Sequence, residues 1–188
     1  MGLANWLTVL RIVLVPVFVT LLVYERGGAA LLVFLGAAAT DSLDGWVARR
    51  AGSQSRLGAF LDPAADKLMV SASFVSLTYL GMLPFWITAV VISRDVILVV
   101  GAVVMHMAGV RVHPRPTRVG KYATFLQFCT VLTGLAVPFL PVPGVLIGVT
   151  WLAAAFTLVS GMQYIVQGVG FVNATQAVEH EDEAAFLR

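Results

Sequence analysis

Charge is scarce in this sequence, since Asp, Glu, Lys and Arg make up only 12% of the 188 residues. Soluble domains carry about twice that share, and the mean hydropathy of +0.91 is far above theirs. The chain also has a single cysteine, Cys129, so no disulfide can form within it. These shortages exclude a soluble globular enzyme, a disordered tail and a disulfide-stapled secreted domain.

The sequence contains long apolar runs. Six of them follow one another, at 5–24, 29–50, 60–81, 84–108, 118–140 and 143–168. A membrane-spanning helix needs about 20 residues, so six use roughly 120 and leave about 68 for loops and tails. The sequence therefore predicts an all-α, polytopic integral membrane protein with six transmembrane helices. We expect one membrane domain over 1–170, a polar acidic tail over 171–188, and no cleaved signal peptide.

The basic residues are divided unevenly between the connections of these segments. The connections after the second and fourth segments carry Arg49, Arg50, Arg56, Arg111, Arg115, Arg118 and Lys121, whereas the opposite three carry only Arg26. Basic loops stay on the cytoplasmic side of a membrane. We therefore expect a multi-pass protein of the cell membrane with both termini in the cytoplasm.

Four of the ten acidic residues fall within 26 residues of one another, at Asp41, Asp44, Asp62 and Asp66. Their spacings of three and four place each pair on one face of a helix, and a short basic loop joins the two segments. Carboxylates gathered at membrane depth repel one another unless a cation neutralises them. An all-oxygen donor set favours Mg²⁺, Mn²⁺ or Ca²⁺. A polar cavity open to the cytoplasm is expected here.

The residues between the two pairs suit a phosphate-bearing ligand. Gly45 and Gly58 let a ligand approach the backbone, and Arg49 lies one turn beyond Gly45, where a guanidinium can bind a phosphate. A divalent metal of this kind usually spans protein carboxylates and substrate phosphates. The pattern thus indicates a pyrophosphate site. A helix-packing role explains any one aspartate equally well, but it does not explain four with two glycines and an arginine.

The stretch Asp41-x-x-Asp44-Gly45-x-x-Ala48-Arg49, and then Gly58-x-x-x-Asp62-x-x-x-Asp66, resembles the signature of the CDP-alcohol phosphotransferases. Every position of that signature is filled, and the six-segment layout is similar as well, so the resemblance covers most of the chain. Members of that family are integral membrane enzymes, usually homodimers, that use an alcohol to displace CMP from a CDP-linked lipid.

The resemblance implies a role for each signature position. Asp41, Asp44 and Asp62 are implied as metal ligands, and Asp66 is implied as the general base and a ligand of a second metal. Two Mg²⁺ or Mn²⁺ ions are implied as cofactors. The implied contacts of the cytidine nucleotide are Gly45, Ala48, Arg49, Ser55 and Gly58.

The N-terminal Asn5-Trp6-Leu7-Thr8-x-x-Arg11-Ile12 resembles the opening of bacterial phosphatidylglycerophosphate synthases and of the related cardiolipin synthases. The stretch 61–67 also fits that branch better than the inositol-phosphate or serine transferases. By this resemblance Asn5, Thr8 and Arg11 would line the region of the lipid headgroup, although helix capping and interfacial anchoring explain them equally well.

Three further cations are candidates for binding the acceptor. Arg118 and Lys121 stand one turn apart at the start of the fifth segment, as a clamp for a phosphate. Arg94 lies within an apolar segment and needs partners; we expect it to face the active-site cavity, with helix pairing as the alternative. Asp95 is next to it in sequence but is expected to point elsewhere on the helix, so the two need not pair.

The acceptor itself stays open between two alcohols. Glycerol 3-phosphate is preferred, because it is the common acceptor in this branch. Glycerophosphate synthases, however, often carry another arginine at the position of Ala102 here, and the Arg94-Asp95 pair resembles cardiolipin synthases, whose acceptor is phosphatidylglycerol.

Two other classes of protein are alternatives. A divalent-cation transporter also holds carboxylates at membrane depth, but all four aspartates here lie in one hairpin without a matching set in the second half. A catalytically dead scaffold would have lost a signature residue, and none is lost. The expected partners are CDP-diacylglycerol, an alcohol acceptor, membrane lipids and a second copy of the chain, without nucleic acid.

Overall fold

The computed structural model describes the backbone of residues 3–51, 56–107, 117–140 and 143–186, and the side chains of 9–40, 67–101, 103, 117–140 and 144–168. The backbone forms the six helices α1 (Leu3–Val23), α2 (Gly27–Ala51), α3 (Arg56–Tyr79), α4 (Phe85–Met107), α5 (Arg118–Ala136) and α6 (Pro143–Phe186). The described residues include no strand, so the all-α class and the helix order predicted from the apolar runs are confirmed.

Two of the tight turns are built by residues in the left-handed region of backbone conformation. Gly81 has a φ of 73° and ends α3, with Met82 N donating to Leu77 O at 2.8 Å. Glu25, with a φ of 58°, follows α1, where Arg26 N donates to Leu21 O at 2.8 Å. Both turns cap the last carbonyls of a helix and reverse the chain, so consecutive helices run antiparallel.

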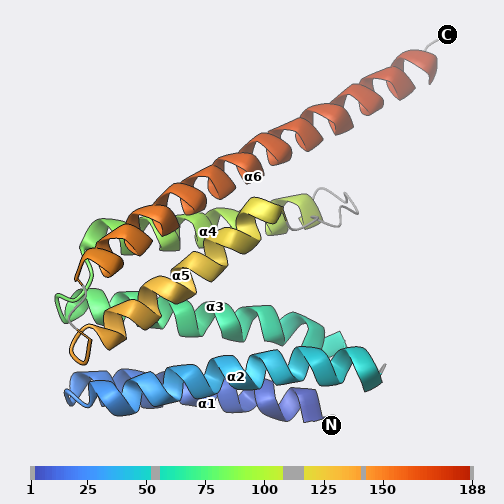
Figure 1. Ribbon diagram of the computed structural model, residues 1–188. Coiled ribbons are helices and arrows are strands. Elements are labelled where there is room, and N and C mark those ends of the chain that lie inside the picture. The colour runs from blue at the N-terminus through green and yellow to red at the C-terminus, as the bar shows by residue number, and fades with distance from the viewer. Residues whose placement is uncertain (1–2, 52–55, 108–116, 141–142, 187–188) are drawn as a thin grey trace.

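The helices pack in two groups that share α3 and α5. In the first group, α1 and α5 each contact both α2 and α3. In the second group, α4 contacts α3 and α6, and α6 contacts α5. Figure 1 shows α1 and α2 as the lowest layer, α3 above them, and α5 crossing toward α4 and α6. The alternation of directions places the end of α2 and the beginning of α3 at the same end of the molecule as the beginning of α5 (Figure 1).

An apolar core joins the first group of helices. Phe18, Phe34, Phe74 and Leu77 are buried in it, and the rings of Phe34 and Phe128 stack with their centroids 4.8 Å apart. Large hydrophobic side chains are also exposed on the outside of the bundle, with Trp151 and Met162 on α6 as examples. Many exposed apolar side chains on one helix suit a contact with lipid or with another protein.

One described helical stretch, Gly144–Gly168 of α6, is long and apolar enough to cross a membrane. Val9–Val23 of α1 and Gly27–Thr40 of α2 are apolar but shorter. That all six helices cross a membrane therefore stays a prediction. The predicted tail continues α6 as helix up to Phe186, because 171–186 contains no proline and is rich in Ala and Glu, which favour helix.

Candidate active site

The four aspartates lie on two helices. Asp41 and Asp44 belong to the second half of α2, and Asp62 and Asp66 to the first half of α3. The helical backbone at these positions gives each pair the spacing of one helix face, as predicted. Their side chains lie outside the described residues, so their roles as metal ligands and base stay predictions.

The predicted nucleotide-contacting residues fall on the same helices. Gly45, Ala48 and Arg49 follow Asp44 on α2, and Gly58 lies one turn before Asp62 on α3. Their side-chain surroundings are outside the described part of the chain, as is Ser55 altogether. At the level of the backbone, the signature thus occupies the end of one helix and the beginning of the next.

The packing refines the predicted hairpin. We expected α2 and α3 to be direct neighbours, but the main described contacts of α2 are with α1 and α5, and α3 shares both of these partners. The four helices therefore form a ring in which α2 and α3 stand across from one another.

A half-open cavity of about 450 Å³ lies among these four helices. Its walls come from all four helices and are almost entirely apolar: Arg11 from α1, Phe34, Leu35, Ala37, Ala38 and Ala39 from α2, Met69 and Val70 from α3, and Phe125 and Phe128 from α5. The cavity begins two residues from Asp41 on α2 and three residues from Asp66 on α3. It is thus next to the aspartate-bearing turns and suits an apolar ligand that carries a polar end.

Arg11 is the one charged residue in the cavity wall. It is only 2% exposed although it carries a guanidinium. A buried arginine of this kind marks a functional or pairing position. The structure thus places one of the predicted headgroup-region residues, Arg11, at the described cavity; the side chains of Asn5 and Thr8 lie outside the described set.

The four aspartates fit a divalent cation by their donor chemistry. They offer only carboxylate oxygens, from two helices that face one another across a ring, and this donor set suits Mg²⁺ or Mn²⁺ rather than zinc. Among the side chains that the structure describes, no group of three or more His, Cys, Asp or Glu forms a second candidate.

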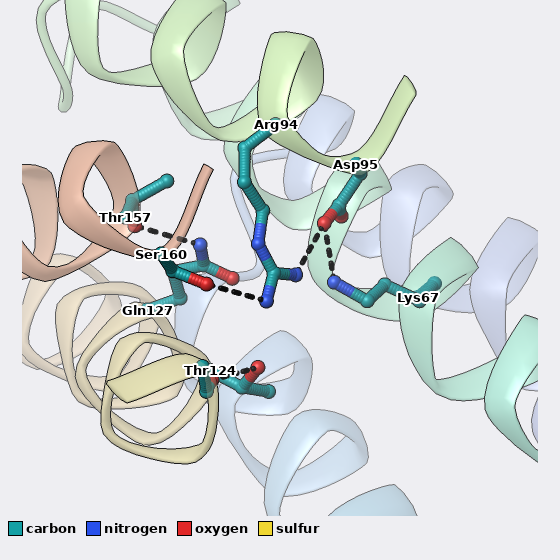
Figure 2. Close-up of polar contacts among 8 residues, drawn as sticks. Lys67, Arg94, Asp95, Thr124, Gln127, Thr157 and Ser160 are labelled. Carbon is teal, nitrogen blue, oxygen red and sulfur yellow. Dashed lines mark hydrogen bonds and ion pairs between the residues drawn. The ribbon is translucent and has the colours of Figure 1, made fainter. Parts of the chain in front are cut away.

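Arg94 lies at the meeting point of α4, α5 and α6. Its side chain is 6% exposed, and its Nη1 donates to Asp95 Oδ1 at 2.8 Å. Its Nη2 donates to Ser160 Oγ on α6 at 3.3 Å. The expectation that Asp95 points away from Arg94 is wrong, because the long arginine side chain turns back toward its sequence neighbour. Both partners of Arg94 are thus within the helix bundle (Figure 2).

Asp95 also pairs with Lys67, which directly follows Asp66 on α3. The same oxygen, Asp95 Oδ1, accepts from Lys67 Nζ and from Arg94 Nη1. Figure 2 shows the carboxylate of Asp95 lying between the two cations. The available sequence signal for this contact was the presence of a few charged residues in apolar segments, because unpaired charges are costly there.

Arg118 and Lys121 occupy the first turn of α5, and both are exposed. Thr117 caps that helix, its side chain accepting from Gly120 N at 3.1 Å. Gly120 packs against the buried network, since a Cβ on it would lie 3.4 Å from Arg94 Nη2. The structure therefore brings the three predicted acceptor residues into one region, with Arg94 buried and the other two at the surface.

Other polar residues of this region were missed as site components. Gln127 Nε2 on α5 donates to Thr157 Oγ1 on α6 at 2.9 Å, and Ser160 lies one turn further along α6. Small polar residues spaced by three in an otherwise apolar segment were the available signal. They connect α5 and α6 around Arg94.

The chain is similar in sequence to known proteins over most of its length. The sequence profile of the CDP-alcohol phosphatidyltransferase family matches residues 1–160. The chain is 36% identical, over 177 residues, to a probable phosphatidylglycerophosphate synthase of Mycobacterium tuberculosis, which covers 89% of this chain and 82% of that protein. It is 32% identical to the CDP-diacylglycerol–glycerol-3-phosphate 3-phosphatidyltransferase of Bacillus subtilis, over 87% of this chain and 93% of the relative.

A human protein represents the second activity of this branch. The CMP-forming cardiolipin synthase of Homo sapiens is 35% identical over 170 residues, which are 81% of this chain and 56% of the human protein. The filled signature, the six-helix fold and the profile match over 1–160 agree. The chain belongs to the CDP-alcohol phosphatidyltransferase family and is an enzyme that transfers a phosphatidyl group.

Proposed function

We propose that the protein is a phosphatidylglycerophosphate synthase, which transfers the phosphatidyl group of CDP-diacylglycerol to glycerol 3-phosphate and releases CMP. The observation that carries this proposal is its likeness to glycerol-3-phosphate phosphatidyltransferases over nearly their whole length, 93% of the Bacillus subtilis protein being covered. The alternative acceptor is phosphatidylglycerol, the acceptor of a cardiolipin synthase, because Ala102 stands where glycerophosphate synthases often carry arginine.

The aspartates are proposed to do the chemistry. Asp41, Asp44, Asp62 and Asp66 would hold two Mg²⁺ or Mn²⁺ ions, which neutralise the diphosphate when bound. Asp66 would take the proton of the attacking hydroxyl. The acceptor oxygen forms a bond to the phosphorus of the phosphatidyl group, the bond from that phosphorus to the CMP oxygen breaks, and CMP leaves. The cytidine nucleotide would contact Gly45, Ala48, Arg49, Ser55 and Gly58.

The cavity inside the ring of helices is proposed to take the diacylglycerol part of the donor lipid. Its apolar walls suit acyl chains, and it adjoins the turns of α2 and α3 that carry the aspartates. Arg11 is its one charged wall residue and would face the polar junction between the glycerol and the diphosphate. The donor would then lie with its diphosphate at the aspartates and its chains toward the middle of the bundle.

The acceptor is proposed to enter from the end where α5 begins. Arg118 and Lys121 are exposed there and offer two cations on one helix face for the acceptor phosphate. Arg94, buried behind Gly120, would contribute positive charge to the same region. The acceptor hydroxyl would then approach the aspartates from the side opposite to the leaving CMP.

We further propose a multi-pass protein of the cell membrane with its active site and both termini on the cytoplasmic side. Support comes from the apolar stretch Gly144–Gly168, from the exposed apolar side chains of α6 and from the basic connections. The assembly is proposed to be a homodimer, as the family resemblance implies. A divalent-cation transporter is the alternative from another class.

The proposal is tested by CMP release from purified protein in detergent with CDP-diacylglycerol and Mg²⁺. Glycerol 3-phosphate and phosphatidylglycerol are supplied in separate reactions. Release with glycerol 3-phosphate alone is the expected result. Release with phosphatidylglycerol alone would make the protein a cardiolipin synthase, and release with neither would contradict both assignments.

A further inference from the structure

The ion pair between Lys67 and Asp95 connects the candidate site to a part of the molecule that the proposed chemistry does not use. Lys67 is half-buried, with a side chain 35% exposed, and Asp95 is 13% exposed. Lys67 directly follows Asp66 on α3, so its side chain extends from the turn that carries the proposed base. Asp95 is on α4, 28 residues further along the chain.

The charge of Lys67 acts on the aspartates because Lys67 is next to Asp66 in the sequence. Unit charges about 10 Å apart in a protein interior interact by an amount that changes a binding constant several-fold. The ammonium of Lys67 therefore opposes a divalent cation at the aspartates. Asp95 offsets part of this positive charge, because its Oδ1 is in contact with Lys67 Nζ.

Asp95 is fixed from the other side as well. Its Oδ1 also accepts from Arg94 Nη1 at 2.8 Å, and Arg94 Nη2 donates to Ser160 Oγ at 3.3 Å. The carboxylate thus lies between Lys67 of α3 and Arg94 of its own helix, and Arg94 in turn contacts Ser160 of α6 (Figure 2). Its single negative charge is shared between the two cations, and burial makes its interaction with both stronger than that of an exposed carboxylate.

We propose that Asp95 is a positioning residue of the transfer reaction: it holds the Lys67 ammonium and offsets part of the positive charge of Lys67 and Arg94, and so preserves the affinity of the neighbouring aspartates for the divalent metal. This role rests on the proposed function, because it assumes that the aspartates bind a metal. In this role, Asp95 affects the binding of the metal and does not contact the acceptor.

The test measures Mn²⁺ binding to the purified, detergent-solubilised protein by the loss of the electron paramagnetic resonance signal of free Mn²⁺, without substrate. Asp95→Asn is expected to weaken Mn²⁺ binding by about 3- to 10-fold. Lys67→Met is expected to strengthen it by a similar factor. The double variant Asp95→Asn/Lys67→Met is expected to return close to the wild-type affinity, and Asp95→Glu to retain it.

Arg26→Met is the matched control, since it removes one exposed cation between α1 and α2, at the opposite end of α2 from the aspartates. It is expected to leave Mn²⁺ binding unchanged. Thermal unfolding of each variant shows whether it is folded. If Asp95→Asn does not fold, the Mn²⁺ affinity of Lys67→Met alone tests the proposal.

The proposal is overturned if Lys67→Met leaves Mn²⁺ binding unchanged or weakens it, or if the double variant binds as poorly as a folded Asp95→Asn. These results are independent of turnover. A protein that binds Mn²⁺ as expected but transfers no phosphatidyl group would refute the proposed function and leave only the effect of Asp95 on metal binding, whereas failure of the wild-type protein to bind Mn²⁺ would refute both.

Discussion

Gln127 and Thr157 connect α5 to α6 through a hydrogen bond that is closed to solvent. The distance from Gln127 Nε2 to Thr157 Oγ1 is 2.9 Å, and both residues are 0% exposed. Hydrogen bonds between helices in an apolar surrounding contribute about 0.6 kcal/mol each and up to about 1.7 kcal/mol. This bond therefore helps to hold the middle of α5 against α6.

Thr157→Val is expected to lower the midpoint of thermal unfolding in detergent, because it keeps the shape of the side chain and leaves Gln127 Nε2 without its acceptor. The loss should lie near 1 kcal/mol. Thr150→Val is the matched control, since Thr150 is buried on the same helix but its Oγ1 donates only to Leu146 O of its own helix. Equal losses in the two variants would contradict a special role for the bond between α5 and α6.

Gly120 separates the proposed acceptor cations from the buried arginine. A Cβ there would lie 3.2 Å from Thr117 Oγ1, 3.3 Å from Ser160 Oγ and 3.4 Å from Arg94 Nη2. Gly120→Ala should therefore displace the helix cap and Arg94, and we expect CMP release to fall by about tenfold or more, since small displacements in a site are costly.

Gly161→Ala is the comparison for this change. Its Cβ would meet Arg94 Cγ at 3.7 Å, which is ordinary van der Waals contact. We expect near-wild-type CMP release from this variant. If both alanine variants lose activity alike, the close approach at Gly120 is not what matters.

The predictable part of this molecule was the part that depends on hydropathy and on local spacing. The six apolar runs indicated the six helices to within a few residues at most ends, because burial of apolar side chains sets where helices form. The signature spacing placed the aspartates on the end of α2 and the beginning of α3. Neither the helix positions nor the placement of the aspartates required knowledge of contacts with distant residues.

Contacts between distant segments were not predictable in the same way. The ring in which α2 and α3 stand across from one another depends on how α1 and α5 pack between them, and no local pattern encodes that packing. Arg94 and Asp95 were expected not to need one another as partners, because neighbouring residues point about 100° apart on a helix. The flexible arginine side chain overcomes that difference.

The first turn of α5 is expected to determine the affinity for the acceptor. Arg118→Ala and Lys121→Ala should each raise the KM for glycerol 3-phosphate by roughly 10-fold or more, as a charge-assisted bond to phosphate is lost. The KM for CDP-diacylglycerol should stay near the wild-type value. Initial rates of CMP release at varied concentrations of each substrate measure the two constants.

Arg26→Ala provides the control for this pair, because it removes an exposed cation at the other end of the bundle. Changes confined to the KM for CDP-diacylglycerol in the Arg118 and Lys121 variants would instead assign these cations to the donor lipid.

The cavity inside the ring should determine the affinity for the donor. Ala38 is one of its lining residues, and Ala38→Leu would fill part of the space. We expect a several-fold higher KM for CDP-diacylglycerol and an unchanged KM for glycerol 3-phosphate. Ala155→Leu, at an exposed position of α6, should change neither constant. Unchanged donor kinetics in a folded Ala38→Leu variant would place the acyl chains elsewhere.

The transfer of radiolabelled glycerol 3-phosphate into lipid tests the central claim most directly. The purified protein is incubated with CDP-diacylglycerol, Mg²⁺ and the labelled acceptor, and the chloroform-soluble product is counted for the wild type and for Asp66→Asn. We predict label in the lipid fraction for the wild type, and none above background for Asp66→Asn, which should still bind CDP-diacylglycerol. Absence of labelled lipid from the wild type, or undiminished labelling by Asp66→Asn, would contradict the account.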